Sequence, residues 1–208
     1  MTTDDPIAEA LLSDSPYERL RAREFRVLGG AIPRKLAWQS YLLLSLAALL
    51  PLVGLLPPGV RETYIGDAAL ATPRWAVIAL FAVGVLWLTG LGHAGIALRL
   101  LALGPGISEV QARELLSLEN VCSLFGFGTA GVAVLATYAF VGIGFAGLDT
   151  LMAYAAVAGN PFTPAPLPVT VGSVAIVAMV GAVVLKFLSA FVYVESVRRG
   201  RSAVRASL

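Results

Sequence analysis

The sequence has very little of what most catalytic sites need. Its 208 residues include one cysteine, Cys122, and one histidine, His93. A single cysteine excludes an internal disulfide and thiol redox chemistry based on paired cysteines. A single histidine excludes a haem held by two histidines and the histidine-rich site of a zinc protease. Because no Gly-x-Ser-x-Gly is present to place a hydrolase nucleophile, we expect a protein that is not an enzyme and has no cofactor and no metal site.

Charge is also scarce. Charged residues make up 13% of the chain and hydrophobic residues 58%, with a mean hydropathy of +0.82. A helix needs about 20 mostly apolar residues to cross roughly 30 Å of hydrocarbon. Four stretches meet that length: 36–56, 75–103, 121–148 and 167–194. The sequence therefore predicts an all-α, multi-pass integral membrane protein, with a four-transmembrane-helix bundle over residues 36–194.

The glycines form a pattern that resembles a nucleotide-binding motif. Gly-x-Gly-x-x-Gly occurs at 90–95, 126–131 and 142–147. That motif binds a pyrophosphate only where a strand turns into a helix, whereas all three copies lie inside apolar stretches. Small residues four apart instead let two membrane helices approach closely. The expected packing residues are Gly90, Ala94, Gly126, Ala130, Gly142 and Ala146, although some of them could simply face lipid.

The positive charges are distributed unevenly along the chain. Twelve Lys and Arg residues precede the first predicted span, flank the connection between the second and third, or follow the fourth, whereas the other two connections contain only Arg61 and Arg74. By the positive-inside rule both termini are expected in the cytoplasm, and the protein in the cell membrane. This arrangement explains most of the basic residues without a nucleic-acid partner. Residues 195–208 form a basic cytoplasmic tail.

The first 35 residues form a cytoplasmic segment that contains an amphipathic helix at 16–28. Ser15 and Glu18 have the spacing of a capping box around Pro16, and Gly29 supplies a stop. Apolar side chains gather on one face of this helix and arginines on the other. An interfacial position against anionic lipid headgroups is favoured. The alternative is a helix docked under the bundle through its apolar face.

A second capping box is expected after the second span. Ser108 precedes an apolar-periodic stretch and Gln111 follows three residues later. No helix breaker separates residue 109 from residue 122. A helix that starts at this cap is therefore expected to continue into the third span.

Polar residues inside the spans gather toward the cytoplasmic side. The candidate intramembrane cluster consists of His93, Glu119, Asn120 and Lys186. Ionisable groups at membrane depth usually face the interior of a bundle and find partners there. We expect Lys186 to pair with Glu119, with His93 nearby. The alternative for Lys186 is that its long side chain extends to the headgroups.

Two classes of function remain open. The first is a non-enzymatic accessory or assembly factor that packs through its small residues, either with another membrane protein or as a homo-oligomer. The second is a small oligomeric transporter or channel that uses the polar cluster. The predicted outer half of the bundle has few polar residues, which favours the first class.

Overall fold

The regular structure of the chain is helical. The computed structural model describes residues 16–23 and 30–206, and within those ranges no strand is formed, although Pro73 and Pro164 make an isolated β-bridge. Four helices are long and apolar enough to cross a membrane. Their bounds are Ile32–Gly54, Arg74–Leu103, Glu109–Phe145 and Val171–Arg198.

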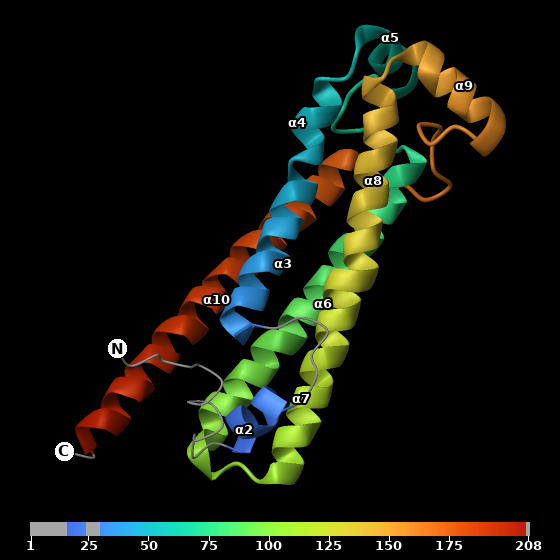
Figure 1. Ribbon diagram of the computed structural model, residues 1–208. Coiled ribbons are helices and arrows are strands. Elements are labelled where there is room, and N and C mark those ends of the chain that lie inside the picture. The colour runs from blue at the N-terminus through green and yellow to red at the C-terminus, as the bar shows by residue number, and fades with distance from the viewer. Residues whose placement is uncertain (1–15, 24–29, 207–208) are drawn as a thin grey trace, which may run out of the picture.

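These four helices are built from named elements (Figure 1). The first joins α3 to α4, the second is α6, the third joins α7 to α8 through the π-helical η3, and the fourth lies within α10. Their bounds are α3 Ile32–Ala47, α4 Leu49–Gly54, α6 Arg74–Leu103, α7 Glu109–Ser123, η3 Leu124–Thr129, α8 Ala130–Phe145 and α10 Val171–Ala206.

The helices start close to the expected positions, except that the first begins four residues earlier and the fourth begins four residues later than predicted. The first begins at Ile32, where Pro33 is tolerated because a first-turn amide has no partner within the helix. The capping box of Ser108 and Gln111 is present, and the helix that it starts runs on through η3 to Phe145. α10 begins at Val171, after the proline-rich segment that holds the chain out of a helix.

α6 lies at the centre of the assembly. It packs against α3, α8 and α10, while α10 lies along α3 on the opposite side from α8 (Figure 1). Lipid supplies no hydrophobic drive between helices, so close contact has to hold them together. A Cβ on Gly90 of α6 would lie 2.5 Å from a methyl carbon of Leu185, so a larger residue there would require Leu185 of α10 to move.

The small residues divide into two groups. Gly90, Ala94, Gly126 and Ala130 are buried between helices. Gly142 and Ala146 are instead exposed on α8, and no other part of the described chain lies within 4 Å of the position of a Cβ on Gly142. The expected packing contact at these two residues is therefore not made within the described chain.

Short helices close the end of the molecule that we call the α9 end (Figure 1). They are α5 Pro58–Val60, the π-helical η1 Arg61–Ile65 and α9 Leu148–Ala158. Gly147 separates α9 from α8 with a φ of +98°, a conformation that side chains with a Cβ rarely adopt. The third span consequently stops at this end of α8.

The opposite end, called the α2 end, carries α2 Pro16–Arg23 (Figure 1). α2 packs against α7, and its Tyr17 side chain is 3% exposed. Among the described residues of α2, Tyr17 is buried and Leu20 packs against the core, as the docked alternative predicts. The predicted helix extended to residue 28, but its cap at Ser15 and residues 24–29 lie outside the described residues.

Candidate functional site

A group of polar side chains is buried near the α2 end, where α2, α3, α6 and α7 meet. All of its members are buried. We call it the polar cluster, and it consists of Tyr17 of α2, Lys35 and Gln39 of α3, Thr89 and His93 of α6, and Glu119 and Ser123 of α7.

Helical spacing explains how the chain brings these residues together. α3, α6 and α7 each contribute two members that are four positions apart. Residues with this spacing lie one above the other on the same face of a helix. Three such faces turned toward a common axis make a compact polar layer between otherwise apolar helices.

An ion pair lies at the centre of the polar cluster. The Nζ of Lys35 is 2.6 Å from Oε1 of Glu119, and the two side chains are 3% and 0% exposed. The hydroxyl of Tyr17 donates a hydrogen bond to Oε2 of the same carboxylate. Both oxygens of Glu119 are therefore engaged by donors from two other helices, which ties α2 and α3 to α7.

Hydrogen bonds continue from the ion pair into α6. Lys35 Nζ donates to Ser123 Oγ at 2.8 Å, and Ser123 Oγ lies 3.2 Å from His93 Nε2. His93 Nδ1 lies 3.3 Å from Gln39 Oε1, and Gln39 Nε2 donates to Thr89 Oγ1 at 2.9 Å. The last hydroxyl donates to the backbone oxygen of residue 85 at 2.7 Å.

Donor and acceptor rules assign the proton of His93 to one ring nitrogen. An ammonium group can only donate, and a side-chain carbonyl oxygen can only accept. With Gln39 Oε1 as acceptor, the proton of His93 resides on Nδ1. The hydroxyl of Ser123 has one proton, which it donates to the backbone oxygen of Glu119 at 2.7 Å. This assignment rests on the network, as histidine tautomers usually do.

The glycine at 126 lets η3 approach the polar cluster. A Cβ on Gly126 would lie 2.5 Å from Gln39 Nε2 and 2.7 Å from Thr89 Oγ1. The π-helical turn begins directly after Ser123. Such turns are often found where a helix must adjust around a functional or strained site. Here the turn seals the polar cluster on the side away from the ion pair.

The expected pair between Glu119 and Lys186 is not formed, because Glu119 pairs with Lys35. Lys186 lies on the outer surface of α10, where its Nζ donates to Tyr41 Oη at 2.8 Å and sits 4.4 Å from the centre of that ring. The physical reason is helical phase. Leu185 and Ser189 face α6 and α3, so their neighbour Lys186 turns outward.

The other expected members have different positions. His93 and Glu119 both belong to the polar cluster. Asn120 is half-buried, and its side chain makes no hydrogen bond to the cluster within the part of the chain that the structure describes. It follows Glu119 by one position, which turns it roughly 100° away around the helix.

The sequence analysis did not predict five members of the polar cluster, which are Tyr17, Lys35, Gln39, Thr89 and Ser123. Lys35 enters it only among the charges that orient the chain. The spacing of Lys35 and Gln39 matches the spacing of Glu119 and Ser123, and this shared i, i+4 pattern is the signal that could have grouped them.

The polar cluster can join helices, and neighbouring groups can exchange protons, but it does not resemble a metal site. Within residues 16–23 and 30–206, no group of three or more His, Cys, Asp or Glu side chains is placed to hold a metal ion. The contacting ammonium and carboxylate cancel each other's charge. Together with the four long apolar helices, these features define the class as an all-helical protein compatible with a membrane location. Comparisons with protein-family models, with curated proteins and with solved structures found no match.

Proposed function

We propose that the protein is a non-enzymatic accessory or assembly factor of the cell membrane, built as a four-transmembrane-helix bundle with both termini in the cytoplasm. The asymmetry of Lys and Arg between alternate connections supports this orientation. The α2 end then faces the cytoplasm. A second membrane helix, from another protein or from a second copy of the chain, binds to α8.

The open face of α8 carries this proposal. Ala139, Gly142 and Ala146 are exposed on one side of α8, although small residues at this spacing are typical of helix contacts. Elsewhere the same pattern is used inside the molecule, as at Gly90 against Leu185. A face of this kind lets a partner backbone approach closely without any rearrangement of the chain.

Substitution of Gly142 tests the proposal. A leucine there has open space within the described chain, so Gly142→Leu should leave folding intact and block close approach of a partner helix. We expect the wild-type protein, extracted in a mild detergent, to migrate as a defined assembly in size-exclusion chromatography with light scattering. The variant should migrate as a single chain of 21.7 kDa plus detergent.

A wild-type protein that is already monomeric and free of other polypeptides would contradict the assembly role. Ile176→Ala is a matched control, because it shortens an exposed side chain on α10, away from the face of α8, without adding bulk. It should leave the assembly in place.

The alternative is a small oligomeric transporter or channel. Its support is the chain of buried polar contacts that runs from Lys35 to Thr89. Against it stands the end of that chain, which is the backbone oxygen of residue 85 within the apolar sequence of α6. Liposomes containing the protein and a pH-sensitive dye decide between the two. Proton flux above that of empty liposomes, abolished by Lys35→Met, would replace the accessory role by transport.

The amino-terminal helix is proposed to lie near anionic headgroups as well. α2 docks on α7 through its apolar side, and the sequence places arginines at 19, 21, 23 and 26. Docking at the α2 end leaves the helix close to the expected membrane surface. Anionic lipid then attracts the arginine-rich segment through a field that salt screens.

A further inference from the structure

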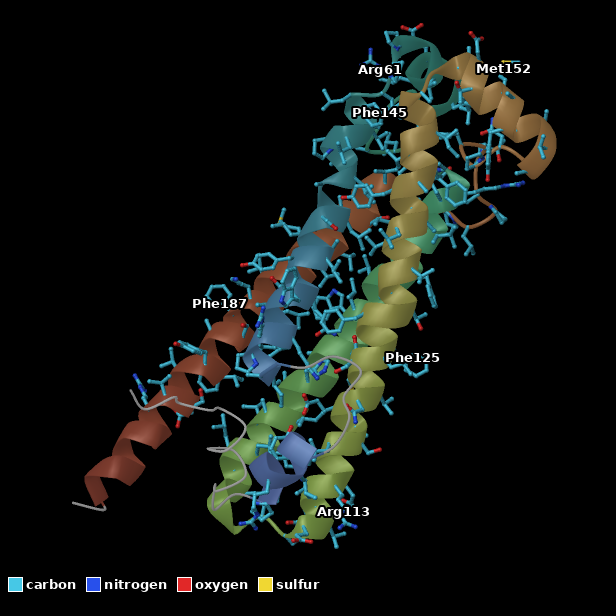
Figure 2. All side chains as sticks on the ribbon, in the orientation of Figure 1. Arg61, Arg113, Phe125, Phe145, Met152 and Phe187 are labelled. Atoms are coloured by element: carbon cyan, nitrogen blue, oxygen red, sulfur yellow. The ribbon has the colours of Figure 1, made fainter. Side chains whose placement is uncertain are left out.

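Lys186 is a charged residue on an outer surface that is otherwise mostly apolar. It is exposed on the face of α10 that the long apolar helices present outward, next to Phe187, which is 73% exposed and points away from the helices (Figure 2). Its ammonium group forms no ion pair with any described residue, and Glu119 is already paired with Lys35. A charge on a lipid-facing surface is costly unless an opposite charge meets it.

A groove runs beside Lys186 between α3 and α10. Its volume is about 410 Å³, within the range of about 300–1,000 Å³ that is usual for small-molecule sites. Apart from Ser40, Tyr41 and Lys186, its lining is apolar. The apolar walls include Leu44, Met179, Val183 and Phe187.

The aromatic residues of α3 indicate the level of this groove. Trp38 and Tyr41 are both half exposed and pack edge to face, with ring centres 6.2 Å apart. Exposed tryptophan and tyrosine are typical of the boundary between headgroups and hydrocarbon. The cationic end of the groove therefore lies where lipid phosphates are found, and its apolar walls lie where acyl chains begin.

Tyr41 holds the lysine in place for a ligand. The ring faces the ammonium group at 4.4 Å and the hydroxyl accepts one of its hydrogen bonds at 2.8 Å. A lysine ammonium group has three donors, so further donors remain for an anionic oxygen. The contact with Tyr41 fixes the direction of an otherwise flexible side chain.

We propose that this groove binds an anionic phospholipid of the surrounding bilayer. The lipid phosphate accepts hydrogen bonds from Lys186, and one acyl chain lies against Leu44, Met179 and Val183. The argument is charge complementarity at one end of the groove and apolar complementarity along the rest. This inference is separate from the helix contact proposed at α8, which lies on another face of the molecule.

Native mass spectrometry of the full-length protein in detergent tests the proposal, with phosphatidylglycerol and phosphatidylcholine as the two probes. We expect the wild type to bind phosphatidylglycerol more tightly. Lys186→Met should weaken that binding by about tenfold or more, because it removes the charged donor of a hydrogen bond to the phosphate. Lys186→Arg, which keeps the charge, should retain it.

Two further variants separate the groove from general charge. Arg99→Gln removes one positive charge from an exposed residue of α6 that does not line the groove. It should leave the preference for phosphatidylglycerol unchanged. Val183→Trp fills the groove from a side chain that is already exposed, and it should weaken binding although Lys186 is intact.

Three results would overturn the proposal: unchanged phosphatidylglycerol binding by Lys186→Met, an equal loss in Arg99→Gln, or unchanged binding by Val183→Trp. Circular dichroism and thermal unfolding of each variant show whether it is folded, so that a loss of lipid binding can be separated from unfolding. All three side chains are exposed, so we expect each variant to unfold at the wild-type temperature.

Discussion

At the scale of single residues, Lys35 and Glu119 control how firmly the helices of the α2 end are joined. Both charges are almost completely shielded from the surroundings, and their 2.6 Å contact lies between α3 and α7. A buried ion pair adds little over a well-packed apolar pair, but either charge alone is strongly unfavourable. The two residues therefore act as a unit whose halves cannot be changed separately.

This coupling makes the first prediction. Lys35→Met and Glu119→Gln should each lower the free energy of unfolding by about 3–5 kcal/mol, because each leaves one charge buried. The double variant should recover much of that loss. Equilibrium unfolding of the purified protein in mixed detergent micelles measures all three values. Losses that simply add in the double variant would show that the two side chains do not act on each other.

The second prediction compares two glycines. A Cβ on Gly90 would meet a neighbouring side chain, whereas a Cβ on Gly142 would meet open space. Gly90→Ala forces Leu185 to move and should cost about 1–3 kcal/mol as overpacking does. Gly142→Ala meets open space and should be neutral, or stabilising by up to about 1 kcal/mol through helix propensity. Thermal unfolding of both variants checks this difference. Equal effects would indicate that α6 and α10 are not in the close contact described.

At the scale of elements, α2 shows what the sequence could and could not predict. Its amphipathic pattern and its start at Pro16 were readable, because local spacing determines them. Its docking on α7 was not, because the deciding contact joins Tyr17 to Glu119 across 102 positions. The same limit applies to the polar cluster. His93 of α6 and Glu119 of α7 were predicted as polar residues in spans, but the phase of α10 that turns Lys186 outward depends on packing.

The third prediction concerns the attachment of α2. Tyr17→Phe removes the hydroxyl that donates to Glu119, a contact to a charged group that contributes about 1.5–3 kcal/mol. Hydrogen exchange of residues 16–23 should become roughly ten or more times faster. Tyr138→Phe is the matched control, since it loses a hydrogen bond to the backbone oxygen of Ser45 and should leave α2 unchanged. Unchanged exchange in Tyr17→Phe would mean that apolar contacts alone hold the helix.

At the scale of the whole molecule, the four long helices were predicted well, because a run of about 20 apolar residues has the length of a membrane-spanning helix. The order in which the helices pack was not available from the sequence. Contacts of α6 with α3, α8 and α10 place it centrally, a role that its length and composition do not reveal. The small-residue pairs at 90 and 142 look alike in sequence and differ only in what surrounds them.

The fourth prediction tests the proposed orientation. In a variant with Cys122→Ala, a new cysteine replaces Ser108 at the α2 end or Asp67 at the α9 end, both exposed outside the long helices. A membrane-impermeant maleimide added to intact cells should label the cysteine at 67 and not the one at 108, which should react only after the membrane is opened. The reverse pattern would place the α2 end outside.

The separation in sequence between the ion-pair partners has a consequence for synthesis. Lys35 and Glu119 are 84 positions apart, and the complete second helix lies between them. A ribosome adds roughly 5–20 residues each second, so about 4–17 seconds pass between the two residues. During that interval the first helix is present without the carboxylate that neutralises its lysine. The first two helices must therefore wait for the third before the α2 end can close, which makes assembly at this end a late event in the maturation of the protein.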